Sequence, residues 1–414
     1  MKDSRPQIVR NVLLGFAITA LLVGVKIAVE HTSWGHRAEV IAFELLQGQL
    51  STFDTEKPLP VVVVDVSKIG ESKDREIIDL QKLKEVVGAI ADQKPRAIGI
   101  DIVLTPEPDL TPSPDQSKVD QRKLDENYFN FLDFCLGSVR QERKIPIYLG
   151  VADRTVGKPE DWLGGEQYRE MAATVIIPKG ETTSIPIWFK AEAGSEKLIS
   201  MSAALARSYQ RVHLPSGLAW AVESADQEFP GTERHLQEDM EYADALVNYS
   251  KLEAIQQNKL LTISDTSVRE SGEKFRDRIV IVGDGSKGKP GDAFVVTGRN
   301  EPFAGVFLHS AAAYTFAREP MYEFKVWVRF LLDLLLSAGI IGWVAIARFR
   351  HLGKKGTFNW HKLQNRLVLV ILSAVLVLAV LLVRFSGILW LDFIMVMLAL
   401  WLHPMVERKV APAK

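Results

Sequence analysis

Several features that commonly reveal a function are scarce in this sequence. One cysteine, Cys135, is present in 414 residues, which excludes an intramolecular disulfide and a thiolate metal site. Lysine and arginine total 50 against 51 aspartate and glutamate residues, a formal net charge of -1. Without a basic excess, the chain lacks the charge that displaces counterions from nucleic-acid phosphates. It also has no histidine-rich metal motif, nucleophile elbow or internal repeat.

Apolar residues are concentrated in four long runs. Residues 8–29 form the first, and about 20 such residues span a bilayer as a helix. A cleaved signal peptide is the alternative, but no small-x-small cleavage site follows the apolar core, so we expect a retained helix. The other three runs lie near the C-terminus, and the expected membrane helices are 326–347, 367–383 and 387–402.

Basic residues predict how these helices are oriented. The connection 348–366 is rich in lysine and arginine and contains no acidic residue, which is typical of a cytoplasmic loop. The basic N-terminus, residues 1–7, gives the same orientation. The block 30–325 then lies outside the cytoplasm, and the tail 403–414 lies inside. Asp333 follows Arg329 by four residues near a helix end, which favours local ion pairing over a transport pathway.

The block outside the membrane has the pattern of an open α/β domain. Valine-rich residues 59–66 predict a buried strand, 76–92 an amphipathic helix, and 96–104 a second buried strand. This order is a βαβ unit. We further expect helices at 124–139, 198–212 and 303–317, and strands at 145–151, 174–177, 245–249 and 278–282. The prediction is a mostly parallel sheet, and such sheets bind ligands outside the carboxyl ends of their strands.

Five stretches in this order resemble the second type of CHASE domain, the cyclase/histidine-kinase-associated sensory extracellular domain. They are VVVVDV, KPRAIGIDIVL, ALVNY, FRDRIVIVGDGSKGKPGDAF and PFAGVFLHSAAAYTFAREP. The resemblance covers residues 54–320 and the flanking helices, and its C-terminal part is the most specific. The segment 67–80 departs from the family because it lacks the expected Trp, Pro and Arg turn.

The resemblance implies a receptor in the bacterial cytoplasmic membrane, with its sensor domain in the periplasm. Family members usually continue into a cytoplasmic output domain. Only twelve residues follow Leu402 here, so we expect a separate signalling partner, and a homo-oligomer is compatible with this arrangement. The basic residues expected to dock that partner are Arg348, Arg350, Lys354, Lys355, Arg408 and Lys409. The alternative is a noncatalytic membrane scaffold that uses the outside domain for protein contacts.

A glycine cluster after the last predicted strand resembles nucleotide-binding motifs. Gly283, Gly285 and Gly288 have the GxGxxG spacing, but a dinucleotide site needs a helix directly afterwards and the next helical signal is distant. Pro290 stands where a P-loop needs Ser or Thr. We therefore expect a glycine turn, with an anion-binding nest as the alternative.

Four aspartates and one histidine are the candidate ligand-binding residues. Asp65 and Asp101 end two strands that a βαβ unit makes neighbours, and Asp284 and Asp292 follow Gly283 in the glycine turn. Oxygen ligands meeting at a sheet edge would bind a polar ligand or a divalent cation, whereas the alternative is turn and helix capping. His309 matches the family's GVxxHxxA pattern and is expected either to contact a ligand or to be a core histidine.

The sequence contains no convincing catalytic motif, and no cofactor is expected. Ser286 and Lys289 have the SxxK spacing, but Gly288 and Pro290 oppose the helix that would align them. The sequence therefore predicts a noncatalytic sensor.

Overall fold

The structure is a computed structural model in which two compact units are described. Residues 54–213 and 224–321 form the α/β unit, and residues 1–53, 214–223 and 322–414 form the helical unit. The α/β unit is therefore shorter than the predicted range 30–325. The described residues are 9–10, 13–14, 16–18, 20–21, 24–25, 40–46, 59–69, 78–104, 121–151, 162–177, 181–190, 196–209, 216–222, 233–237, 240–257, 262–286, 293–296, 301–352, 360–391 and 397.

A six-stranded parallel sheet is the centre of the α/β unit. Its strands are β1 (Val61–Asp65), β2 (Ala97–Val103), β3 (Ile147–Val151), β4 (Ala172–Thr174), β10 (Thr262–Ser264) and β11 (Ile279–Gly283). Their order across the sheet is β10-β1-β11-β2-β3-β4, and each neighbouring pair is parallel. The runs of valine and isoleucine in β1 and β11 are buried on both faces, as parallel strands between helical layers require.

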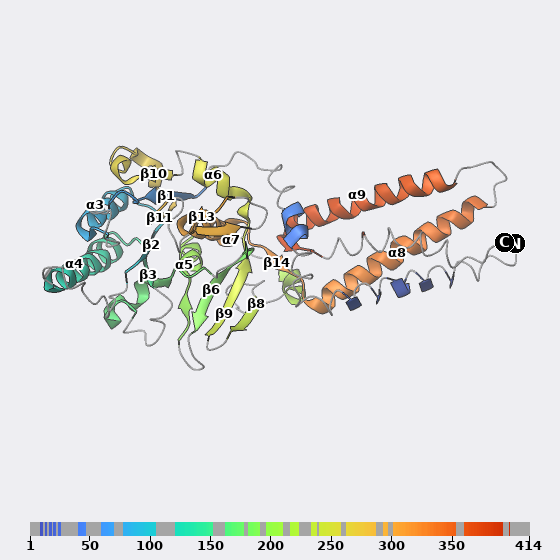
Figure 1. The fold of residues 1–414 in the computed structure, drawn as a ribbon, viewed down its shortest axis with the longest axis horizontal. Coiled ribbons are helices and arrows are strands. Elements are labelled where there is room, and N and C mark those ends of the chain that lie inside the picture. The colour runs from blue at the N-terminus through green and yellow to red at the C-terminus, as the bar shows by residue number, and fades with distance from the viewer. Residues whose placement is uncertain are drawn as a thin grey trace. The chain divides into compact units, whose positions relative to one another are not determined.

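Helices cover both faces of this sheet (Figure 1). On one face, α3 (Leu80–Ala91) and α4 (Gln121–Phe134), which continues as a π-helix (Cys135–Glu142), pack against alternate residues such as Val62 and Val64. On the other face, α5 (Met201–Arg207) lies against β2 and β3, and α7 (Gly305–Arg318) lies against β1 and β11. Asp79 caps α3 by accepting from the backbone N–H groups of Gln81 and Lys82.

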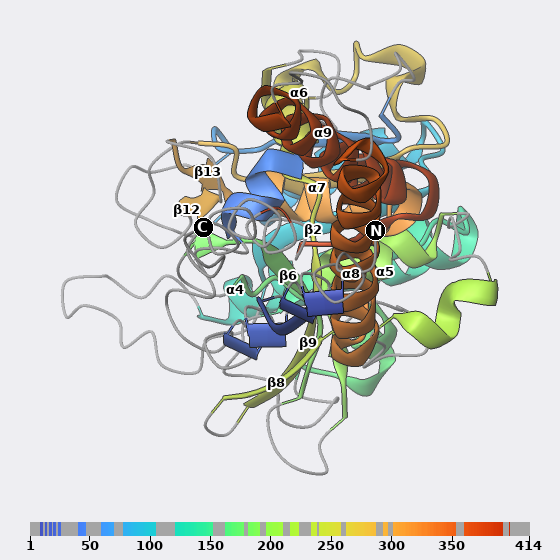
Figure 2. The same cartoon turned by 90° about the vertical axis from the view of Figure 1, so that its right-hand side faces the viewer.

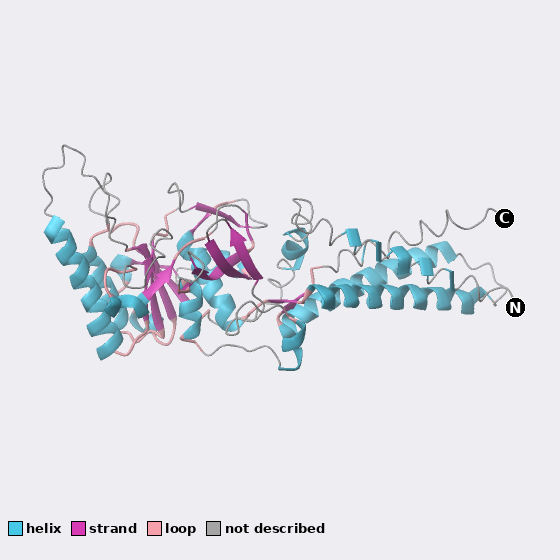
Figure 3. Ribbon diagram, turned by 90° about the horizontal axis from the view of Figure 1, so that it is seen from below, coloured by secondary structure: helices cyan, strands magenta, loops and turns pink. Residues whose placement is uncertain are grey.

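A second, antiparallel sheet lies in the same unit. Its strands are β6 (Ser184–Lys190), β7 (Leu198–Ile199), β8 (Glu233–Gln237) and β9 (Met240–Leu246), in the order β7-β6-β9-β8. β6, β9 and β8 run side by side in Figure 2, and Figure 3 separates their group of strands from the parallel sheet. The remaining elements are β5 (Glu181–Thr182), β12 (Ala293–Val296), β13 (Phe303–Ala304), α6 (Leu252–Gln257) and 3₁₀ helices at Glu166–Met171, Ser216–Ala221, Tyr249–Lys251, Asp265–Ser267 and Gly272–Phe275.

The predicted α/β class with a mostly parallel sheet is confirmed, and several elements differ in detail. The predicted helices 198–212 and 303–317 begin with the short strands β7 and β13, and their helical parts are Met201–Arg207 and Gly305–Arg318. β11 lies between β1 and β2, so those two strands are not direct neighbours as the βαβ pattern implied. The short strand expected at 174–177 is β4, which ends at Thr174. The expected strand 245–249 is the end of β9, and its last residue, Tyr249, begins a 3₁₀ helix instead.

In the helical unit, the structure describes two long helices, α8 (Val326–Leu352) and α9 (Trp360–Ser386). None of the helices, taken over its described residues, combines the length and apolar content that a membrane span needs. The four predicted membrane helices therefore remain predictions. Both helices extend into the predicted loop 348–366, whereas Ile388–Leu389 forms β15 where the helix 387–402 was expected to begin. β15 pairs in parallel with β14 (Tyr322–Glu323).

The first turns of α8 bury polar residues and expose apolar ones. Arg329, Asp333 and Ser337, spaced four residues apart, are at most 5% exposed. Trp327, Leu331 and Leu335, two residues earlier in each turn and therefore on the opposite face, are 50%, 43% and 67% exposed. Asp333 accepts a hydrogen bond of 2.8 Å from Nε1 of the buried Trp390. This polarity is the reverse of that of an ordinary surface helix.

Candidate functional site

At the carboxyl edge of the sheet, β1 and β11 end in register with Asp101, which lies near the end of β2. Asp65 on β1 pairs with Gly283 on β11, which pairs in turn with Asp101 on β2. Successive strand residues alternate between faces, so all three belong to the face that α5 and α7 cover. The row therefore brings the predicted residues Asp65, Asp101 and Gly283 together, with the glycine between the two aspartates.

Asp101 occupies an irregular part of β2. Against β3, the register passes from Ile100 opposite Leu149 to Val103 opposite Gly150, so Asp101 and Ile102 form a bulge. Bulges re-aim side chains and are common beside functional sites. The Asp101 side chain is 10% exposed, and burial raises the pKa of its carboxyl from 3.8 to about 7.

His309 is an ionisable residue close to this carboxyl. Its Nε2 atom lies 3.9 Å from Asp101 Oδ1, too far for a hydrogen bond. Nε2 instead lies 3.1 Å from the carbonyl oxygen of Val175, which is able only to accept, and Nδ1 lies 2.9 Å from Ser202 Oγ. Nε2 therefore donates to this carbonyl, whereas the Ser202 hydroxyl can either donate to Nδ1 or accept from it. Fully buried His309 thus connects α7 to α5 and to the chain after β4.

The other two candidate aspartates that the structure describes, Asp65 and Asp284, stabilise turns. Asp65 Oδ1 accepts from the backbone N–H groups of Ser67 and Gly285, at 3.0 Å and 2.9 Å. Asp284 Oδ1 accepts from the backbone N–H of Ser286, at 2.9 Å, and from its hydroxyl. The turn-capping alternative therefore accounts for these contacts. Asp101 differs, because no hydrogen bond reaches its carboxyl from the described part of the chain.

The glycine cluster has a packing reason at its first position. A Cβ on Gly283 would lie 2.9 Å from Cγ2 of Val306, at the start of α7, and 3.2 Å from the Cβ of Asp101. No helix follows directly, since residues 284–286 are irregular and the next described element is β12. Gly283 therefore allows α7 to approach the strand end closely. Lys287, Gly288 and Lys289, which the anion nest would need, lie outside the described residues.

Other predicted site residues are not placed. Asp292 lies outside the described residues, as do the docking residues Lys354, Lys355, Arg408 and Lys409. Arg348 and Arg350 belong to α8, but their side chains are not described. Within the described chain, no group of three or more His, Cys, Asp or Glu side chains is arranged to hold a metal ion.

Three residues around Asp101 were not predicted from the sequence. Ser202 and Val175 contact His309 from separate parts of the chain, and no sequence pattern marks such contacts. Gly150 lies opposite the bulge, where a Cβ would lie 2.4 Å from the carbonyl oxygen of Ile102. A glycine inside the apolar strand IYLGV was the available signal, because strand glycines mark bulges and close backbone approaches.

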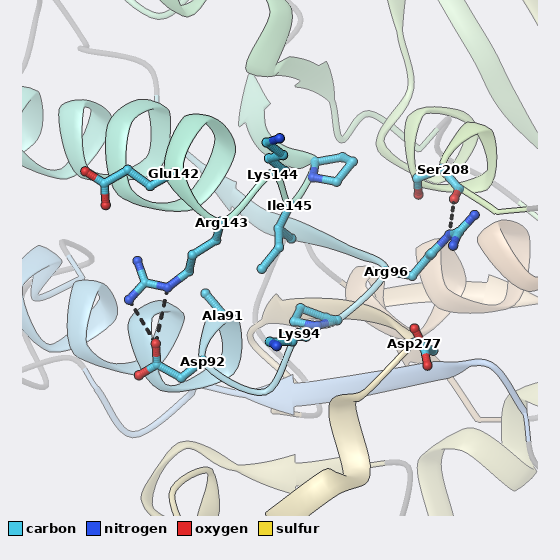
Figure 4. A pocket seen from close by; sticks show the side chains of 12 residues that line it. Ala91, Asp92, Lys94, Arg96, Glu142, Arg143, Lys144, Ile145, Ser208 and Asp277 are labelled. Atoms are coloured by element: carbon cyan, nitrogen blue, oxygen red, sulfur yellow. Dashed lines mark hydrogen bonds and ion pairs between the residues drawn. The ribbon is translucent and has the colours of Figure 1, made fainter.

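A cavity of about 770 Å³ lies at the opposite, amino-terminal edge of the sheet (Figure 4). Its charges are of both signs and are partly paired. Arg143 forms an ion pair with Asp92 at 2.8 Å. Arg96 Nε donates a hydrogen bond to the carbonyl oxygen of Ser208 at 2.7 Å. Lys94, Lys144 and Asp277 line it with positive φ angles of 56° at the turns that precede β2, β3 and β11. Each of these residues lies in the turn between a helix and the next strand. The cavity is therefore formed by helix-to-strand turns.

A family model described as the CHASE2 domain matches residues 17–348. The chain belongs to the CHASE2 family. This match confirms the resemblance found in the sequence, and it covers the parallel sheet, α7 and most of α8. CHASE2 is a sensory domain of the extracellular type, which is consistent with a sensor in general. No curated protein and no solved structure matches this CHASE2 chain.

Proposed function

We propose that this protein is a membrane-anchored sensor that binds a signal molecule at the carboxyl edge of its parallel sheet, outside the cytoplasm. The observation that carries the proposal is the Asp101 carboxyl, which lies 3.9 Å from His309 on α7 and accepts no hydrogen bond from the described residues. A ligand that changes the charge of Asp101 also changes the electrostatic field that acts on His309. His309 is fixed to α5 and to the chain after β4, so α7 is the element that this change affects most directly.

The relay would run along the chain from α7. This helix ends at Arg318, and β14 begins at Tyr322. Within the helical unit, Tyr322 N donates to the Gly387 carbonyl and Lys325 N to the Ala221 carbonyl, both at 2.8 Å. The segment that leads into α8 is thus bonded to two other parts of that unit. Signalling requires that the ligand bind one arrangement of this segment more tightly than another.

Membrane anchoring is supported by the reversed polarity of α8. Exposed leucines with buried arginine and aspartate on the opposite face suit a hydrocarbon surrounding, where polar groups must find partners inside the protein. Trp327 stacks with Trp220 at 5.6 Å between ring centroids, and the rings are 50% and 58% exposed. Tryptophan is enriched at membrane interfaces. The signal would leave through the predicted cytoplasmic loop and tail to a separate partner.

Cysteine labelling in intact cells tests the orientation. Cys135 is buried, and burial raises the pKa of its thiol, so the natural cysteine gives little background. Gln141 is exposed in the α/β unit, and residue 354 lies in the predicted cytoplasmic loop. We expect a membrane-impermeant maleimide to label Gln141→Cys in intact cells and to label Lys354→Cys only after lysis.

The unmodified chain is the control for reaction at Cys135, and denatured samples show that each introduced thiol is present. Labelling of position 354 but not 141 in intact cells would place the α/β unit in the cytoplasm and contradict the proposal. Recovery of the chain in the soluble fraction would contradict membrane anchoring itself.

A further inference from the structure

The carboxyl edge also indicates what kind of molecule it binds. We propose that the site takes the protonated amine of a small organic ligand, with Asp101 as the carboxylate that pairs with it. This inference rests on the proposed function and specifies its ligand class. The described chain brings three carboxyl groups to this edge, those of Asp65, Asp101 and Asp284.

Asp101 differs from the other two carboxyl groups in the hydrogen bonds that it accepts from the described residues. Asp65 accepts two backbone N–H groups, and Asp284 accepts the N–H and hydroxyl of Ser286. Asp101 is nine-tenths buried, and the described chain donates no hydrogen bond to it. A carboxylate offers about four acceptor positions, so Asp101 has acceptor positions left for a bound molecule. A ligand that donates hydrogen bonds is therefore the complement of this group.

The surrounding side chains favour a cation over a neutral donor. His309 faces Asp101 from α7, and among the described residues the charged groups at the neighbouring strand ends are the carboxylates Asp65 and Asp284. Ser202 on α5 is uncharged, and Lys68, which follows β1, is exposed. A positive ligand gains from these carboxylates, whereas a negative one is repelled.

Pairing with an ammonium group would also release a proton. An unoccupied, buried carboxyl holds its proton to higher pH than an exposed one, and the ammonium stabilises the ionised form. Near pH 6, one proton leaves Asp101 as the ion pair forms, and no bond in the ligand changes. Binding therefore strengthens as the pH rises, and the heat of binding depends on the ionisation enthalpy of the buffer.

The test uses the full chain in lipid nanodiscs at pH 8, with methylammonium, ethanolamine and a short diamine as probes. Tetramethylammonium, a cation without N–H donors, is the matched control. We expect at least one primary amine at about ten times its Kd to raise the unfolding temperature of the wild type by about 2–4 °C. The shift should vanish in Asp101→Asn and remain in Asp277→Asn, a substitution of an exposed aspartate at the opposite edge.

Calorimetry at pH 6 in two buffers should then show proton release for the amine that shifts the unfolding temperature. The ligand class is wrong if none of the probes shifts the wild type, if Asp101→Asn retains the shift, or if tetramethylammonium is equally effective. An equal shift by a neutral polyol without proton release also overturns it. These failures leave the proposed function intact when the cysteine-labelling pattern is as expected, so the two claims are tested separately.

Discussion

Replacing Asp101 with asparagine will stabilise the protein at pH 8 and have a much smaller effect at pH 5. Burial raises the pKa of this carboxyl from 3.8 to about 7 in the folded chain. The folded state therefore binds more protons than the unfolded state between these values, and stability falls as the pH rises from about 4 to about 7. Above pH 7 the full penalty, about 4 kcal/mol at most, is present. Asparagine cannot ionise and removes it.

Thermal or urea unfolding of the full chain at both pH values measures this difference. At pH 5 the expected gain is less than half of that at pH 8, because part of the penalty is not yet present. Asp277→Asn is the control, since this aspartate is exposed. A gain of the same size at pH 5 and pH 8 would mean that the substitution acts through packing and not through the charge of Asp101.

Replacing Gly150 with alanine will destabilise the α/β unit by about 3 kcal/mol. The added Cβ would lie 2.4 Å from the carbonyl oxygen of Ile102 and 3.1 Å from that of Ile100. Both atoms belong to the backbone of β2, so no side-chain rotation relieves the clash. The strand must shift at its bulge, and Asp101 shifts with it. We therefore also expect a weaker dependence of stability on pH in this variant.

Gly88→Ala provides a control of the same chemistry. A Cβ at this position in α3 meets only Cζ of Phe134, at an ordinary distance of 3.6 Å. Alanine is the better helix former, so we expect a gain of about 0.5–1 kcal/mol. Denaturant unfolding of the two variants compares them directly. A loss below about 1 kcal/mol for Gly150→Ala would show that the bulge adapts easily and does not fix the position of Asp101.

The sequence predicted the parallel sheet well because its strands carry a strong local signal. Buried valine and isoleucine runs mark β1 and β11, and the stripe of apolar residues in 76–92 marks α3. Strand order has no such signal. β11 enters between β1 and β2 although it follows β2 by more than 170 residues, and only long-range packing decides that. Of the antiparallel sheet only the end of β9 was expected, and a polar strand such as ERHLQ in β8 carries no apolar signal.

The candidate site was predicted in its location but only partly in its roles. Aspartates at strand ends indicated the carboxyl edge, and the register places Asp65 and Asp101 in one row there. Their different roles depend on which backbone N–H groups reach each carboxyl, and that depends on turn geometry. The bulge at Asp101 and the contacts of His309 with Ser202 and Val175 arise only after folding brings separate elements together.

The most direct measurement of the central claim is hydrogen exchange in α7 and β14 of the full chain at pH 5.5 and pH 8.5, corrected for the intrinsic effect of pH. The proton serves as the probe, because these conditions lie on either side of the pKa of Asp101, about 7. We expect amides in residues 305–325 of the wild type to lose about tenfold in protection at the higher pH, and those of Asp101→Asn to change little. The same pH response in both proteins, or a response confined to β2, would contradict a relay from Asp101 through α7.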